Sequence, residues 1–436
     1  MQTIKNLFYY FKHPPRHIVV AASAWASKVI TAFTGFISIR ELILYLGEEK
    51  YAIYAIAYSL IGWFTISQFG IGSSLQNFIS ESRVKNNNYD KYMISALQLI
   101  VIFFTVSLLI IFPLSNHIQS FIFRKFGTLN EPIVLCVSVV TLITVMSGIA
   151  YNVLFAWHKG YIPNILPAIA STISLISIII LRCYTSSTNL TAALLIFLLP
   201  QMLLAVFFFI KTFKIFFTKF FNINIENIKA LFLRASKFYL ITLLGTIYTL
   251  TDYIIASQFL STSEIVKYNI FMKIFLLPIF VYESLLAAIW PVRSEMYIKG
   301  NFREIKAMTF RYCAYGIFLM LIFTLLIIIF KDFVIKLLSP DTAIVTSDAF
   351  IAAFAVYAII RSLTQNYITL LESVNVLRIF AISFPFLVTL NIFLQCFFAK
   401  QYGAIGILFS LILSQVAFIW IYQIKIYKIL KHSTVG

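Results

Sequence analysis

The sequence predicts an all-α integral membrane protein with about twelve transmembrane helices in two bundles of six. Three observations lead to this prediction. The composition is more apolar than a soluble chain needs, because 61% of the 436 residues are hydrophobic and only 11% are charged. The apolar residues form runs of the roughly 20 residues that a helix needs to cross a bilayer. The longest hydrophilic stretch lies near the middle and divides these runs into two sets.

The predicted spans have boundary errors of roughly three residues at each end. They cover residues 17–45, 51–79, 91–113, 132–156, 162–182, 190–210, 237–260, 265–291, 308–330, 347–370, 376–398 and 403–425. An even number of spans places both termini on the same side of the membrane.

The distribution of basic residues predicts that this side is the cytoplasm. Most of the 34 lysines and arginines lie in connections on the side of the termini, with clusters at Arg83–Lys91, Lys211–Lys237 and Arg293–Arg311. The net charge of +18 is therefore explained by topology. Because the cations lie in short segments between apolar runs, no nucleic acid is expected as a partner. The expected surroundings are a lipid bilayer crossed many times.

The central hydrophilic stretch predicts three parts of the chain. Residues 1–210 form the N-terminal bundle, 211–236 a cytoplasmic amphipathic linker, and 237–436 the C-terminal bundle. The later part of the linker shows helical periodicity in Ile225, Ile228, Leu231, Phe232 and Ala235. Beside its basic residues, this pattern predicts a helix on the inner membrane surface that contacts anionic headgroups. A solvated linker is the alternative.

An internal repeat relates the two halves. A shift of 214 residues places Glu81 on Glu295, Asp90 on Glu304, Tyr54 on Tyr268 and Leu46 on Leu260. A repeat of six spans predicts two bundles related by a pseudo-two-fold axis along the membrane normal. That arrangement leaves a cleft between the bundles, and rocking of the halves would open the cleft to each side in turn.

Ionisable residues inside predicted spans are costly and mark functional positions. They are Lys28, Arg40, Glu41, Asp252, Lys273, Glu283 and Arg361. Lys28 and Arg361 are predicted near mid-membrane in different halves, which favours a shared cavity, and Lys273 is a third cation for it. Such a cavity would bind phosphate or an acidic sugar. Arg40 lies nearer the outer interface, where Glu41 is expected to pair locally.

Asp252 and Glu283 are the main buried acids, and two roles remain open for them. They neutralise the buried cations, or they bind a proton or sodium ion that drives transport. Gly70, Gly72, Pro200, Pro278 and Pro385 are candidate bending points, with ordinary helix packing as the alternative.

The cysteines and histidines predict no metal site. Cys136, Cys183, Cys313 and Cys396 are widely separated, and the five histidines are equally scattered. No catalytic cluster is visible. We therefore expect no cofactor other than a coupling proton or sodium ion, and no enzyme activity.

Two segments resemble a known family. They are Gln68-Phe69-Gly70-Ile71-Gly72-Ser73-Ser74-Leu75-Gln76-Asn77 and the preceding Leu46-Gly47-Glu48-Glu49-Lys50-Tyr51-Ala52-Ile53-Tyr54-Ala55. With the whole-chain pattern, they resemble the O-antigen and capsular polysaccharide flippases, of the superfamily that contains the MATE exporters. Many members of that family carry an acid where this chain has Gln68, which weakens the case for ion coupling through the second helix.

The resemblance implies a MATE-like fold and a role in lipopolysaccharide biosynthesis. An undecaprenyl-pyrophosphate-linked oligosaccharide would move across the bacterial inner membrane by alternating access, without covalent chemistry. Lys28, Arg361 and Lys273, then Arg40, would bind the anionic head, and Gln76 and Asn77 would hydrogen-bond sugar hydroxyls. The polymerase and the chain-length machinery are the protein partners that this implies.

Two alternatives stay open. A MATE-like drug or cation exporter would be expected to rely on acids, whereas cations outnumber acids in these spans. A membrane-embedded O-antigen polymerase, which is an enzyme, would be expected to have a large periplasmic loop. The largest outer loop predicted here, at about residues 113–132, is too short for a catalytic domain. A lipid II flippase is expected to carry two additional spans.

Overall fold

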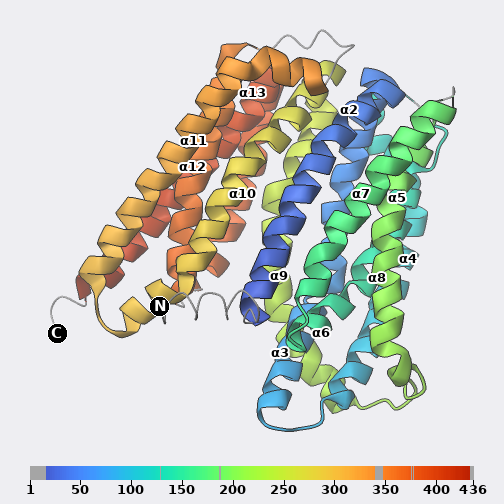
Figure 1. The fold of residues 1–436 in the computed structure, drawn as a ribbon, viewed down its shortest axis with the longest axis vertical. Coiled ribbons are helices and arrows are strands. Elements are labelled where there is room, and N and C mark those ends of the chain that lie inside the picture. Colours follow the sequence, from blue (N-terminus) through green and yellow to red (C-terminus); the bar gives the residue numbers. More distant parts are fainter. Residues whose placement is uncertain are drawn as a thin grey trace, which may run out of the picture. The chain divides into compact units, whose positions relative to one another are not determined.

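The computed structural model describes residues 16–127, 129–185, 188–338, 347–374, 376 and 378–432. The chain divides into two compact units, the first ending at Thr246 and the second beginning at Ile247 (Figure 1). The described residues form helices and short turns, without a strand. The two units are described separately below.

Unit 1 is built from long helices joined by short connections. Its elements are α2 (Arg16–Phe64), η1 (Thr65–Gln68), α3 (Ile71–Val84), α4 (Asp90–Ile122), η2 (Arg124–Phe126), α5 (Ile133–Ser147), α6 (Ile149–Ala156), α7 (Tyr161–Tyr184), α8 (Leu190–Phe217) and the first part of α9 (Ile225–Phe259). Within the unit, α2 packs on α7 and α5, and α5 packs on α8.

Unit 2 contains the rest of α9 and four further helices. They are α10 (Thr262–Ile298), α11 (Phe302–Leu338), α12 (Asp348–Ser373) and α13 (Arg378–His432). Helix α12 packs against α10, α11 and α13. The start of α10 is defined by Ser261, which forms a capping box with Glu264, and the start of α12 by the side chain of Ser347.

Glycines divide two of the continuous helices. Gly47 in α2 has φ 73° and Gly403 in α13 has φ 59°, a left-handed region that L residues with side chains rarely adopt. Gly47 falls between two of the predicted spans, and Gly403 is the first residue of the last predicted span. In the predicted second span, Phe69 and Gly70 are left-handed and separate η1 from α3.

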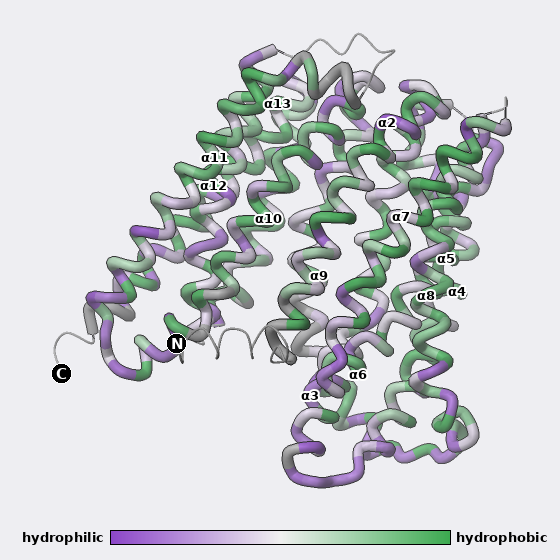
Figure 2. Tube along the Cα trace, viewed as in Figure 1, coloured by the Kyte–Doolittle hydropathy of each residue, from purple (hydrophilic) through white to green (hydrophobic). Residues whose placement is uncertain are grey.

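Nine of the described helical segments are long and apolar enough to cross a membrane, which confirms an all-α multi-pass membrane fold. Helix α9 is outside these nine, and α2 and α13 each cover two predicted spans. The count of twelve therefore stays a prediction. In unit 1, hydrophobic residues run along the middle of α4, α5 and α8, while hydrophilic residues gather in the connections (Figure 2).

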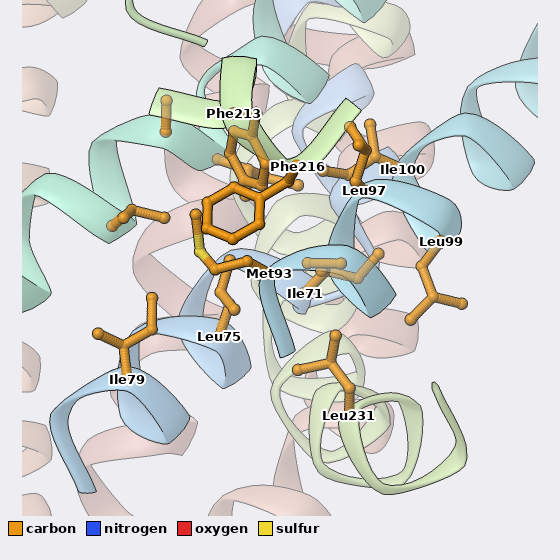
Figure 3. Packing of buried hydrophobic residues seen from close by; sticks show 14 of the residues in the cluster. Ile71, Leu75, Ile79, Met93, Leu97, Leu99, Ile100, Phe213, Phe216 and Leu231 are labelled. Atoms are coloured by element: carbon orange, nitrogen blue, oxygen red, sulfur yellow. The ribbon is translucent and has the colours of Figure 1, made fainter. Parts of the chain in front are cut away.

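The core of unit 1 includes the first part of α9. Ile71, Leu75 and Ile79 of α3 pack with residues of α4 and α8, and Leu231 of α9 lies in the same cluster (Figure 3). Ala235 is buried there as well. Part of the apolar face of the predicted linker helix thus packs onto its own unit, and the division between units lies further along α9 than residue 236.

Positions matched by the internal repeat have similar surroundings in their own units. Tyr54 and Tyr268 are both buried, as are Leu46 and Leu260. Asp90 lies in the first turn of α4, and Glu304 lies in the first turn of α11. These surroundings agree with the internal repeat, and the pseudo-two-fold axis stays a prediction.

Candidate functional site

Arg361 and Glu283 form an ion pair inside unit 2. Arg361 Nη2 on α12 lies 3.7 Å from Glu283 Oε1 on α10, and Arg361 Nη1 donates to the hydroxyl of Tyr357 at 3.0 Å. The Nε of Arg361 is buried without a hydrogen-bond partner. A predicted anion-binding cation and a predicted coupling acid are therefore partners, so Glu283 offsets part of the positive charge of Arg361.

Asp252 of α9 is held by hydroxyl and amide groups. Asp252 is only 2% exposed, and its Oδ2 accepts a hydrogen bond of 2.6 Å from the hydroxyl of Tyr268 on α10. Oδ1 accepts a bond of 2.8 Å from the backbone N–H of Tyr253. Among the described residues, no basic side chain lies within 4.0 Å of this carboxylate, although Arg361 is within electrostatic reach. Asp252 is thus the less neutralised of the two acids.

Further polar groups lie in the core of unit 2. The hydroxyl of Tyr248 on α9 lies 3.1 Å from Ser414 Oγ, which donates to Asn391 Oδ1 at 3.2 Å. Gln395, one turn beyond Asn391, is fully buried, and both of its amide atoms are without a hydrogen-bond partner. Buried polar groups are normally satisfied, so the amide of Gln395 is an exception in the core of unit 2.

Arg293 is a buried cation that the sequence analysis assigned to a cytoplasmic connection. It lies near the end of α10, is 0% exposed, and is the largest fully buried side chain in the described structure. Its Nη2 donates to Asn366 Oδ1 at 2.5 Å, and its guanidinium lies over the ring of Tyr312 at 5.9 Å. Its position at the end of the apolar run through Ile289 was the only signal in the sequence.

The other predicted cations are divided between the units. Lys28 on α2 is exposed and Arg40 on α2 is half-buried, both in unit 1, whereas Lys273 on α10 is half-buried in unit 2. Lys28 and Lys273 both interact with neighbouring groups. A cavity shared by Lys28 and Arg361 stays a prediction.

Glu41 pairs across the unit rather than with its neighbour in sequence. Its Oε2 lies 2.8 Å from the Nε of Arg182, near the end of α7. The contact is one of charge, since the two groups are not aligned as a hydrogen bond. The expectation of a local partner was wrong, because α2 packs along α7 and brings the two ends together.

The segment from Gln68 to Asn77 packs closely against α5 and α6. The Nε2 of Gln68 donates to the backbone oxygen of Val145 at 2.5 Å. A Cβ on Gly72 would collide with the amide of Asn152, so Gly72 permits a close approach of α3 and α6. Gln76 and Asn77 are half-buried on α3. Their predicted contact with sugar stays a prediction.

The predicted bending points differ in local structure. Gly70 is left-handed and precedes α3, whereas Gly72 lies within α3. Pro200, Pro278 and Pro385 lie inside α8, α10 and α13, which continue through them. Motion at any of these positions stays a prediction.

The described part of the chain contains no group of three or more histidine, cysteine or acidic side chains that could hold a metal ion.

The helical architecture and the buried charges define a multi-pass membrane transporter fold, and solved structures share it. A multidrug resistance MATE family transporter in its inward-facing conformation matches with TM-score 0.76 at 14% identity, over 94% of this chain and 99% of that chain. The lipid II flippase MurJ, in an inward closed conformation, matches with TM-score 0.71 at 14% identity, over 96% of this chain and 91% of that chain.

The chain belongs to the polysaccharide biosynthesis protein family, whose sequence pattern matches residues 21–297. A Yersinia pseudotuberculosis protein named "Putative O-antigen export protein" is 33% identical over 92% of this chain and 93% of its own length. A Salmonella typhi protein named "Putative O-antigen transporter" is 31% identical over the same two shares. The family resemblance predicted from the two sequence segments is confirmed. These relatives are named as transporters, not as enzymes.

Proposed function

We propose that this protein is a flippase that moves an undecaprenyl-pyrophosphate-linked O-antigen repeat unit across the bacterial inner membrane. The observation that carries the proposal is the similarity to O-antigen transport proteins over 92% of the chain. At 31–33%, this identity is well above the 14% identity to the MATE exporter. A fold shared with a lipid II flippase supports the same substrate class.

The mechanism that fits is alternating access. A hydrophilic sugar diphosphate cannot cross hydrocarbon without shielding, whereas its polyprenyl tail can stay in lipid. Lys28, Lys273 and Arg40, with Arg361, would attract the diphosphate, and Gln76 and Asn77 would bind hydroxyls. Because Glu283 offsets part of the charge of Arg361, substrate binding at Arg361 would compete with an internal pair.

Coupling to an ion is the second part of the proposal, and Asp252 is the better candidate for it. Glu283 has a basic partner, whereas Asp252 is bonded to neutral donors. A proton or sodium ion would lower the cost of that buried carboxylate. In proteoliposomes, Asp252→Asn should remove the response of flipping to a sodium or pH gradient. An unchanged response would exclude Asp252 as the coupling group.

We place both termini in the cytoplasm, following the distribution of lysine and arginine. The O-antigen polymerase and the chain-length machinery are the partners expected for such a flippase.

Gene replacement in the host tests the function. Deletion should abolish the surface polymer while lipid-linked repeat units accumulate inside, and wild type should restore it. Lys28→Ala and Arg361→Ala, compared at equal membrane levels, should restore it less well. If single repeat units still reach the surface after deletion, the protein acts as a polymerase. If the polymer is unaffected and drug sensitivity changes, it acts as an exporter.

A further inference from the structure

The turn between α8 and α9, residues Thr218–Asn224, exposes apolar side chains that a water-facing loop would not carry. Phe221 is 86% exposed and Ile223 is 70% exposed, and Ile225, the first residue of α9, is 75% exposed. Exposed apolar residues in a contiguous patch mark a contact surface. We call Phe221, Ile223 and Ile225 the apolar tip.

The backbone of the turn is fixed, so the apolar tip is held outward. Gln98 of α4 is buried, and its Nε2 donates to the backbone oxygen of Phe220 at 2.6 Å and to that of Asn222 at 3.3 Å. Phe220 packs against the core of unit 1, whereas Phe221 beside it points away from that core. The two hydrogen bonds from Gln98 therefore hold the turn in the conformation that exposes Phe221.

We expect the apolar tip near the level of lipid headgroups. Helix α8 has 28 residues, and a helix of that length extends about 42 Å, which exceeds a hydrocarbon core of about 30 Å. Because the predicted span 190–210 ends before the last turns of α8, these turns and the residues that follow them are expected beyond the core. Ile210, Ile215 and Phe217 on α8 are exposed as well, so the apolar surface continues from the membrane-spanning part to the turn.

Exposed lysines flank the apolar tip in the sequence. They are Lys211 and Lys214 on α8, Lys219 in the turn and Lys229 on α9. Lys219 lies 4.0 Å from Asp90, and Lys211 lies over the ring of Phe207 at 6.0 Å. Glu226 is the one exposed acid between Thr218 and Lys229, so the surface is positively charged overall.

We infer that this turn is an interfacial anchor that binds phospholipids with anionic headgroups. The apolar tip enters the boundary between headgroups and acyl chains, and Lys214, Lys219 and Lys229 contact lipid phosphates. Apolar side chains interleaved with lysines at the end of a spanning helix fit a charged lipid surface. The inference does not depend on the transported substrate.

Spin labels test the depth of the apolar tip. Phe221→Cys or Ile223→Cys is introduced into a variant in which Cys136, Cys183, Cys313 and Cys396 are replaced by serine, and Asn222→Cys is the neighbouring control. In nanodiscs, oxygen should reach the labels at 221 and 223 more than a water-soluble nickel chelate does. The nickel chelate should reach the label at 222 more than oxygen does. If nickel reaches all three equally, the turn lies in water and the anchor is wrong.

Lipid competition tests the charge. Lys214→Gln, Lys219→Gln and Lys229→Gln together should weaken the preference for phosphatidylglycerol over phosphatidylcholine by about fivefold per lysine removed. The control removes Arg124, Lys267 and Lys400 in the same way and should change the preference less. An equal loss in both variants would overturn the inference. So would displacement of the bound lipid by millimolar inorganic phosphate, because the site would then bind free phosphate.

Discussion

Arg293 and Arg361 both lie inside unit 2, and their partners differ. Arg361 is paired with a carboxylate, whereas the partners of Arg293 among the described residues are the amide of Asn366 and an aromatic ring. Burying a guanidinium without a counter-charge costs free energy. The hydrogen bonds to Asn366 and the contact with the ring therefore have to offset this cost. Arg361 is therefore one member of an ion pair, whereas Arg293 links α10 to Asn366 of α12 without a carboxylate partner.

Replacing Arg293 should destabilise unit 2. Arg293→Ala should cost about 2–5 kcal/mol, because it leaves a cavity and removes the donor to Asn366 Oδ1. Arg293→Met fills more of the volume without a charge and should cost less. Thermal unfolding of purified variants measures both, with the exposed Arg303→Ala as control. Equal losses for the alanine and methionine variants would contradict this account.

Glu283 should restrain Arg361. Glu283→Gln removes the counter-charge, so binding of an anionic substrate should strengthen if Arg361 contacts it. Arg361→Gln should weaken binding, and the double variant should resemble Arg361→Gln. Binding of a diphosphate-linked glycan to the purified protein checks this order. Weaker binding in Glu283→Gln at unchanged stability would show that Arg361 acts only within the pair.

At the element scale, a salt bridge fastens α3 to the first part of α9. Arg234 donates from Nη2 to Glu81 Oε1 at 2.6 Å and from Nη1 to Oε2 at 3.1 Å, and its guanidinium lies over the ring of Phe78. Both residues lie outside the candidate membrane spans. The hydrogen-bonded Arg234 lowers the pKa of the Glu81 carboxyl below its ordinary value.

The stability from this bridge should depend on pH. Because the pKa of Glu81 is lower in the folded protein, the contribution is fully present above the ordinary glutamate pKa of about 4.3 and is lost as pH falls through the folded value. Partial exposure limits it to roughly 0.2–1 kcal/mol. Wild type should therefore unfold at higher temperature than Glu81→Gln near pH 7, and the difference should vanish in acid. A difference independent of pH would exclude the carboxylate as its source.

At the break of α13, the backbone beside Gly403 contacts the start of α10. Gly403 is left-handed, and Glu264 Oε1 accepts a hydrogen bond of 3.4 Å from the N–H of Ala404, while Oε2 accepts from Ser261 at the cap of α10. A Cβ on Gly403 would collide with that carboxylate. The carboxylate of Glu264 therefore accepts hydrogen bonds both at the start of α10 and at the break in α13.

Gly403→Ala should destabilise the protein by roughly 1–2 kcal/mol or more, from the left-handed backbone and the collision with Glu264. Gly35 lies within α2 and has open space around its Cα, so Gly35→Ala is a control that should be neutral or stabilising. Thermal unfolding compares them. A neutral Gly403→Ala would mean that the chain relaxes at this break without cost.

At the scale of the whole molecule, loops of unit 1 that were predicted on the same side of the membrane lie at the same end of the unit. Lys50 bonds to Thr188 and Glu131 to Thr191 at one end, whereas Arg83 bonds to the backbone of Ala156 at the other. In unit 1, the ion pairs of Lys219 with Asp90 and of Arg234 with Glu81 join connections that were predicted to be cytoplasmic. This agrees with alternating loops on two sides.

Cysteine labelling in cells should give the absolute orientation. In the protein without native cysteines, Thr185→Cys should react with a membrane-impermeant maleimide added to the periplasmic side, and Asn222→Cys should react only after the membrane is opened. The charge distribution is the physical reason, since lysine and arginine are retained in the cytoplasm. Reaction of Asn222→Cys from the periplasmic side would invert the predicted topology.

Much of the fold was predictable because bilayer thickness sets a minimum length of apolar residues. The break at Gly47 matched a gap between predicted spans, and the break at Gly403 fell on the first residue of the last predicted span. The division of residues 132–156 into α5 and α6 at Gly148 was missed, since hydropathy does not change there. The candidate site was less predictable. The pair of Arg361 and Glu283 was open as a possibility, but the partners of Glu41 and Arg293 lie far away in sequence.

The amino-acid sequence alone determined the class of protein and its family, because hydrophobic length and local motifs are read along the chain. Only the tertiary structure decided that Arg182 pairs with Glu41, that Glu283 pairs with Arg361, that Tyr268 bonds to Asp252, and that the apolar tip stays outside the core. The physical reason is that ion pairs and hydrogen bonds act over a few ångströms. Their partners are set by which helices pack together, and no local pattern encodes that packing.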